Sequence, residues 1–220
     1  MMLQRFKNRR DAGKALAALL AKYANQPGVV VLALPRGGVP VAFEVAEALN
    51  APLDVFLVRK LGTPGQEELA MGAIASGGIR ILNPSVVDWL GIPDEAIDRI
   101  TAGEQRELER RERAYRDDLP PAEVRGRTVI LVDDGLATGS TMRAAVKAIK
   151  QQSPTRLIVA VPVAPLSTCG ALKEEVDEVV CPLSLDQFDG VSRWYEDFSQ
   201  TPDDEVRMLL ELSNREVAKG

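Results

Sequence analysis

Short apolar runs alternate along the chain with segments in which apolar residues recur at helical spacing. The runs are continuous rather than alternating, which is typical of strands buried on both faces of a parallel sheet. They span residues 29–34, 53–58, 128–132, 157–163 and 178–181. Helical segments at 41–49 and about 141–151 follow the first and third runs. The pattern predicts an α/β fold, a mainly parallel sheet with helices on both faces, in one domain spanning 1–220.

The amino-terminal segment combines basic residues with the apolar run 15–21, which superficially resembles a signal peptide. The run is short for that purpose and Lys22 follows it at once. The spacing of Leu16, Leu20 and Tyr23 instead predicts an amphipathic helix. No run approaches the roughly 20 apolar residues that a membrane span needs. We therefore expect a cytoplasmic protein with no membrane partner.

A long insertion separates the second and third parallel strands. Two strand-like pieces at 72–75 and 79–82 flank a Gly-Gly pair and predict a hairpin. The insertion follows at about 83–123, and its core is a predicted helix from 93 to 116. Glutamates and arginines are interleaved along this helix, which favours a solvated helix with i,i+4 ion pairs. The arginines leave a nucleic-acid patch as the alternative, which the glutamates disfavour.

Composition narrows the chemistry. The 220 residues carry 27 Lys and Arg against 32 Asp and Glu, a net charge of −5, so we expect no nucleic-acid partner. Histidine is absent from the sequence, which excludes histidine metal sites and Ser-His-Asp or Cys-His nucleophiles. Two cysteines, Cys169 and Cys181, do not make a disulfide framework and fit a reducing compartment.

The strongest chemical signal follows the strand at 128–132, where two adjacent carboxylates lead into a loop of small and hydroxyl residues. The segment reads Asp133, Asp134, Gly135, Leu136, Ala137, Thr138, Gly139, Ser140 and Thr141. Backbone N–H groups of 138–141 and the hydroxyls would form an anion nest at the start of a helix. Because no lysine follows the glycine, this is not a Walker A loop and suits a monophosphate.

The acid pair restricts the ligand further, because carboxylates beside a phosphate nest would repel the phosphate itself. Asp133 and Asp134 are expected to face hydrogen-bond donors, such as the cis-hydroxyls of a ribose, or a magnesium ion. A sugar ring that carries a 5-phosphate satisfies both halves of the loop. The alternative is a helix cap beside a solvated strand end, which does not require two consecutive acids.

A second candidate anion loop follows the strand at 29–34. It consists of Pro35, Arg36, Gly37 and Gly38. The glycines expose backbone amides and the guanidinium adds a fixed positive charge, although a Gly-Gly pair alone is more often a turn. Arg59 and Lys60 follow the next strand, either as further cations at this edge or as solvated strand-end residues. Two anion sites around a diol site fit a ribose with phosphates at both ends, 5-phosphoribosyl 1-diphosphate.

Residues 129–141 closely resemble the signature of type I phosphoribosyltransferases: four apolar residues, two acids and a small-residue loop ending Thr-Gly-Ser-Thr. The resemblance implies that residues 137–141 hold the 5-phosphate and that the acid pair binds the ribose hydroxyls. Residues 35–38 look like the diphosphate loop of the family, whose cis peptide, carried over, falls between Arg36 and Gly37. The whole chain is also similar to bacterial predicted phosphoribosyltransferases of unassigned substrate, through 34–41, 59–62 and 194–198.

The same resemblance implies a reaction. A nitrogen of a small acceptor would displace pyrophosphate from C1 of the ribose through an oxocarbenium-like transition state. Arg36, backbone amides of Gly37 and Gly38, and Mg²⁺ held mainly by the substrate near Asp133 and Asp134 would stabilise the leaving group. Hypoxanthine-guanine enzymes carry an aspartate at the position of Ala137, so this residue disfavours 6-oxopurine acceptors.

The acceptor site is expected near the carboxyl end, in a small hood. Four of the ten aromatic residues lie within eleven positions there, and Trp194 and Tyr195 are candidates to stack on a planar base. Packing of the last helices is the alternative. The insertion at 83–123 would close over the site and exclude water. A regulatory protein that binds phosphoribosyl diphosphate without transferring it is the second functional hypothesis, and a homodimer stays open as the assembly.

Overall fold

The structure is a computed structural model that describes residues 5–116 and 119–217. Its centre is a five-stranded sheet in which every neighbouring pair is parallel, in the order β2-β1-β6-β7-β9. The strands are β1 (Val29–Ala33), β2 (Leu53–Val55), β6 (Thr128–Val132), β7 (Arg156–Ala160) and β9 (Glu178–Val180). The apolar runs therefore form the parallel sheet that the sequence predicts.

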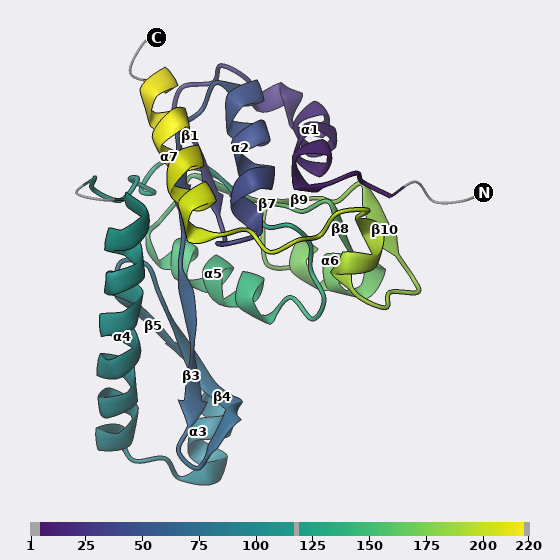
Figure 1. The fold of residues 1–220 in the computed structure, drawn as a ribbon. Helices are drawn as coiled ribbons and strands as arrows, with labels where there is room; N and C mark the ends of the chain where they lie inside the picture. Colours follow the sequence, from purple (N-terminus) through teal and green to yellow (C-terminus); the bar gives the residue numbers. More distant parts are fainter. Residues whose placement is uncertain (1–4, 117–118, 218–220) are drawn as a thin grey trace.

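Helices cover both faces of this sheet (Figure 1). One face packs against α1 (Arg9–Leu19), α2 (Gly38–Leu49) and α7 (Asp203–Val217), and the other against α5 (Ser140–Gln151) and α6 (Leu166–Lys173). Successive residues of β1 enter opposite core clusters, with Val31 in the first and Leu32 in the second. This double burial explains why the strand sequences do not alternate.

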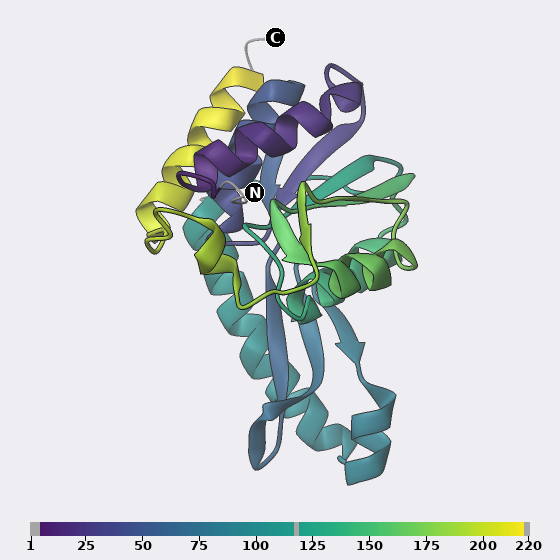
Figure 2. The same cartoon turned by 90° about the vertical axis from the view of Figure 1, so that its right-hand side faces the viewer.

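An arm projects from one edge of the sheet (Figure 1 and Figure 2). Its antiparallel strands are β3 (Val58–Thr63), β4 (Gln66–Ala75) and β5 (Ile79–Leu82), and its helices are α3 (Pro84–Leu90) and α4 (Asp94–Arg116). The predicted run 53–58 is thus two strands, since β2 ends at Val55 and the arm begins with β3. The insertion consequently starts at Val58 rather than at 83, and the hairpin belongs to it.

Helix α4 has the mixed-charge surface that its sequence predicts, with Glu107 accepting hydrogen bonds from both Arg110 and Arg111. Its other face is buried at Ile97, Leu108, Tyr115 and Arg116. The helix therefore packs along the arm and ends against the sheet. Within 5–116 and 119–217, no helix combines the length and apolar character that a membrane span needs.

The remaining elements form a small cap beside the sheet. Strands β8 (Val163–Pro165) and β10 (Leu183–Leu185) pair in parallel, followed by the short helix η2 (Val191–Trp194); the other short helix, η1 (Ala21–Tyr23), follows α1. At the end of η2, residues 194–196 contact the amino-terminal segment. Phe6 N donates to the Trp194 carbonyl at 2.9 Å, and Glu196 N donates to the Phe6 carbonyl at 2.9 Å.

Candidate functional site

Two loops meet at the carboxyl edge of the sheet because β1 and β6 are parallel neighbours in register, with Ala33 opposite Val132. Their contact requires glycine. A Cβ on Gly37 would lie 1.9 Å from Asp134 Oδ2, and one on Gly38 would lie 2.9 Å from the Val132 carbonyl oxygen. The Pro35–Gly38 loop therefore lies directly against the acid pair, as two anion loops around one ligand require.

The acid pair is half-buried and held from three sides. Arg9 Nε donates to Asp134 Oδ2 at 2.8 Å, and Asp134 N donates to Asp133 Oδ1 at 2.8 Å. The Tyr195 hydroxyl donates to the Asp134 carbonyl at 2.6 Å. Burial raises the pKa of both carboxyls; the neighbouring Asp134 charge adds to the rise at Asp133, whereas Arg9 opposes it at Asp134. The pair can accept hydrogen bonds from hydroxyl donors while one guanidinium offsets part of its charge.

The second half of this loop leads into α5. Gly139 has a left-handed backbone with φ of 73° and precedes the first residue of the helix. The Thr168 hydroxyl donates to the Ala137 carbonyl at 2.9 Å and ties the loop to α6. The loop side chains Ala137, Thr138, Ser140 and Thr141 are exposed, so a ligand can reach the N–H groups at the start of α5.

Gly135 serves a packing purpose, with φ of 155° and no room for a side chain. A Cβ there would lie 2.6 Å from Val191 Cγ1. Leu136 N donates to the Val163 carbonyl at 2.9 Å. These contacts fix the path of the loop between the acid pair and the nest.

A cavity of about 120 Å³ lies beside the Pro35–Gly38 loop. Arg36 and Arg59 both line it, so the structure brings these two cations together. Arg36 is also 3.8 Å from Asp203 Oδ1, which accepts a 2.7 Å hydrogen bond from the Tyr115 hydroxyl. Burial and the Asp203 carboxylate raise the pKa of Tyr115 to about 12, so its hydroxyl stays protonated at neutral pH.

The cis peptide of this loop joins Pro35 to Arg36, one bond earlier than the expected Arg36–Gly37 bond. Gly37 instead has a helical backbone, with φ of −61° and ψ of −30°, because it immediately precedes α2 as the N-cap residue. The turn after β1 spans residues 35–37 and leads directly into α2.

Lys60 does not join the Arg36 cluster, because successive side chains of a strand point to opposite faces. It lines a second cavity of about 480 Å³ between the arm and α5. Thr138, Ser140 and Thr141 line the same cavity, together with Arg143 and Lys147 of α5. Lys60 thus lies on the nest side of the site rather than on the Arg36 side.

The carboxyl-terminal aromatic residues divide into two environments. The Tyr195 side chain is buried, with its ring centroid 5.7 Å from that of Phe6 and 5.0 Å from that of Phe198. It therefore packs rather than offering a face to a base, and its hydroxyl positions the Asp134 backbone. Trp194 is half-buried, and its Nε1 is enclosed without a hydrogen-bond partner in the described part of the chain.

The sequence does not predict four residues as part of the site: Arg9, Tyr115, Arg111 and Asp203. Arg9 lies in a basic run that looks solvated, yet its guanidinium stacks 4.0 Å above the Phe198 ring while it binds Asp134. The α4 residues belong to a charge pattern that favours a solvated helix. A helical-spacing signal exists only for Arg111 and Tyr115, which are four residues apart and share one face.

Metal binding by protein groups alone finds little support. Across 5–116 and 119–217, no group of three or more His, Cys, Asp or Glu side chains is arranged to hold a metal ion. The half-buried pair Asp133 and Asp134 is compatible with a magnesium ion that takes most of its ligands from bound phosphates, which is how Mg²⁺ usually binds.

Comparisons with known proteins cover most of the chain. The family model described as "Phosphoribosyl transferase domain" matches residues 2–196. A protein named "Putative phosphoribosyl transferase" in two Mycobacterium tuberculosis strains is 43% identical over 215 residues. That match covers 98% of this chain but 48% of the relative, so the chain spans about half the length of these curated relatives. The crystal structure of TT1426 from Thermus thermophilus has 42% identity and a TM-score of 0.82, covering 94% of this chain and 98% of that one.

Proposed function

Because this chain belongs to the type I phosphoribosyltransferase family, we propose that it transfers the 5-phosphoribosyl group of phosphoribosyl diphosphate to a nitrogen of a small, base-like acceptor. One observation carries the proposal. The acid pair lies between an anion nest at the start of α5 and the Pro35–Gly38 loop, which Gly37 brings against Asp134. A ribose with a phosphate at each end places anions at both loops and hydroxyl donors at the acids.

The nest residues bind the 5-phosphate in this proposal. They are Ala137, Thr138, Gly139, Ser140 and Thr141, supported by the turn at Gly135. Exposed N–H groups at a helix start attract a phosphate through both hydrogen bonds and the helix dipole. Asp133 and Asp134 accept hydrogen bonds from the ribose hydroxyls, and Arg9 keeps the Asp134 carboxylate in place at 2.8 Å.

The diphosphate lies against the Pro35–Gly38 loop and the guanidinium groups of Arg36 and Arg59. The bond from C1 to the diphosphate oxygen breaks with its electron pair while the acceptor nitrogen bonds to C1 and releases its surplus proton to water. Fixed cations stabilise the charge that develops on the leaving group. Magnesium, when bound by the substrate phosphates near the acid pair, offsets part of that charge.

The proposed acceptor is defined by its chemical class, a planar heterocycle with a nucleophilic nitrogen. A planar heterocycle would approach C1 from the side opposite the diphosphate, and Trp194, like Phe188, is an aromatic residue of the cap that is half-buried rather than fully buried. Ala137 provides no carboxylate to read a 6-oxopurine. Tyr195 does not stack on the acceptor, since only 3% of this residue is exposed.

The proposal is tested by ligand-dependent melting. A ligand at a hundred times its Kd stabilises the fold by about 2.7 kcal/mol, which raises Tm by roughly 5–10 °C for a protein of this size. Phosphoribosyl diphosphate with magnesium should give this rise, and ribose 5-phosphate a smaller one. Asp133→Asn combined with Asp134→Asn should remove both shifts, whereas the exposed Asp186→Asn should leave them unchanged.

Three results separate the alternatives. No shift with saturating phosphoribosyl diphosphate contradicts the proposed function. A shift without pyrophosphate release across a panel of nitrogenous bases supports the regulatory hypothesis instead. Arg36→Ala should reduce the phosphoribosyl diphosphate shift toward that of ribose 5-phosphate, because it removes a contact only at the diphosphate end.

A further inference from the structure

Three arginines from three separate elements line the 120 Å³ cavity. Arg36 follows β1, Arg59 lies in β3, and Arg111 lies on α4, a helix of the arm. Tyr115, one turn after Arg111, and Thr141 of the nest complete this part of the wall. The cavity therefore connects the loop after β1 with the nest, and α4 forms one of its sides.

Each of these arginines has a carboxylate beside it. Arg111 Nε donates to Glu107 Oε1 at 2.8 Å, Arg59 Nε donates to Glu104, and Arg36 lies 3.8 Å from Asp203. None of the three acids lines the cavity in the part of the chain that the structure describes. Since these bonds use only the Nε atoms of Arg59 and Arg111, the terminal N–H groups of both side chains remain as donors for a ligand.

We propose that α4 completes the diphosphate site and that Arg111 binds the leaving group directly, together with Arg36 and Arg59. The inference rests on the proposed function and assigns to the arm a binding residue that the sequence places on a solvated helix. A diphosphate carries several charges on two tetrahedral groups, and planar guanidinium forks match its oxygens in pairs. Three forks around one small cavity suit this anion better than a monophosphate, which the nest can hold alone.

Asp203, at the start of α7, acts against the same ligand. Its carboxylate interacts with Arg36 and accepts the hydrogen bond of Tyr115, two residues that line the cavity. A diphosphate must therefore compete with this carboxylate for Arg36 and is repelled by its charge. Asp203→Asn keeps an oxygen for the Tyr115 hydroxyl while removing the charge, so it should bind pyrophosphate more tightly than the wild type.

The experiment compares two neighbouring arginines of α4. Arg111→Gln removes the third fork, and Arg110→Gln is its matched control, because Arg110 binds the same Glu107 but does not line the cavity. Calorimetry measures magnesium pyrophosphate and ribose 5-phosphate separately. Loss of one charge-assisted hydrogen-bonding group should weaken pyrophosphate about tenfold or more in Arg111→Gln. The control should stay within twofold for pyrophosphate, and ribose 5-phosphate should stay within twofold in both variants.

The outcomes keep the two proposals apart. Arg111→Gln with wild-type pyrophosphate affinity overturns the inference, and so does an equal loss of both ligands, which would indicate distortion of the whole site. Tighter pyrophosphate binding by Asp203→Asn supports it, and weaker binding contradicts it. If the wild type binds pyrophosphate but not ribose 5-phosphate, the proposed function fails while the anion pocket stands. If it binds ribose 5-phosphate and Arg111 makes no difference, the proposed function stands and the inference fails.

Discussion

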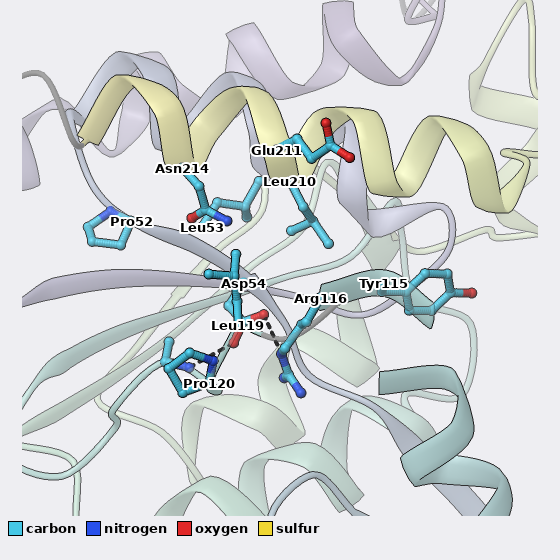
Figure 3. Close-up of a pocket in the computed structure, with 11 residues that line it drawn as sticks. Pro52, Leu53, Asp54, Tyr115, Arg116, Leu119, Pro120, Leu210, Glu211 and Asn214 are labelled. Carbon is cyan, nitrogen blue, oxygen red and sulfur yellow. Dashed lines mark hydrogen bonds and ion pairs between the residues drawn. The ribbon is translucent and has the colours of Figure 1, made fainter. Parts of the chain in front are cut away.

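Replacing Arg116 should destabilise the fold severely, because its guanidinium joins the arm to the sheet inside the protein. Arg116 lies at the end of α4 beside edge strand β2, where Figure 3 shows it meeting Asp54 at a cavity of about 390 Å³. Its Nε donates to Asp54 Oδ1 at 2.7 Å and its terminal nitrogen to the Val55 carbonyl at 2.6 Å. Both charged side chains are about nine-tenths buried, with 8% of Arg116 and 11% of Asp54 exposed.

The burial of the pair sets the size of the effect. Removing one partner of a buried ion pair costs about 3–5 kcal/mol, because the remaining charge is left in a poorly solvating environment. Among the residues that the structure describes, Arg116→Leu leaves Asp54 with two backbone donors, Ala122 N and Val55 N, at 2.8 and 2.7 Å. For a protein of this length each kcal/mol lowers Tm by roughly 2–4 °C, so we expect a loss of about 6–20 °C.

Urea unfolding, followed by circular dichroism, measures this loss as a change in the free energy of unfolding. Arg113→Leu is the matched control, an exposed arginine on the same helix whose replacement should change stability by less than about 0.5 kcal/mol. The double variant Asp54→Leu with Arg116→Leu should recover part of the loss, because the buried Asp54 charge is no longer left without its partner. Glu112, 3.1 Å from a terminal nitrogen of Arg116, still loses its ion pair, so the recovery is incomplete. A loss below about 1 kcal/mol in Arg116→Leu, or additive losses in the double variant, would refute the account.

Two further predictions concern the site itself. Gly37→Ala should weaken ribose 5-phosphate binding at least tenfold in calorimetry, because the added Cβ would lie 1.9 Å from Asp134 Oδ2 and would displace that carboxylate. Gly103→Ala, which has open space around it, is the control, and equal affinities of the two variants would contradict the packing argument. The raised pKa of Asp133 means that folding favours its protonated form, so the free energy of unfolding increases as the pH falls from neutral through that raised pKa. Over the same pH range the affinity for ribose 5-phosphate should decrease, because the ribose hydroxyls lose an ionised acceptor. Both pH dependences should be smaller in Asp133→Asn, and unchanged profiles would show that another group titrates.

The sheet and its two loops follow from the sequence for identifiable reasons. Runs such as 129–132 are apolar at every position because both faces are covered, which separates a parallel sheet from an antiparallel one. Once β1 and β6 are parallel neighbours, the loops that follow them must meet at the same edge of the sheet. Gly37 and Asp134 therefore come together, although no local sequence pattern predicts their contact.

The arm and the ion pairs of the site could not be predicted in the same way. Apolar residues continue after Val55 as Phe56, Leu57 and Val58, so no turn residue marks the end of β2 there. Arg9 and Asp134 are 125 positions apart, and neither has a spacing signal that points to the other. Arg111 looks like any arginine on a charged helix, because the path of α4 past the cavity is set by the packing of its buried face.

The amino-terminal segment and the segment after η2 are joined by backbone hydrogen bonds, in which Phe6 pairs with the backbone around Tyr195. Arg9 and Tyr195 lie on these two segments, and both hold Asp134. If this backbone pairing opens, Asp134 loses the contacts with Arg9 and Tyr195. A sugar that needs Asp134 in place therefore binds only the molecules in which the two segments are paired. Binding must then slow the exchange of amide hydrogens in both segments, which couples local opening far along the chain to ligand affinity.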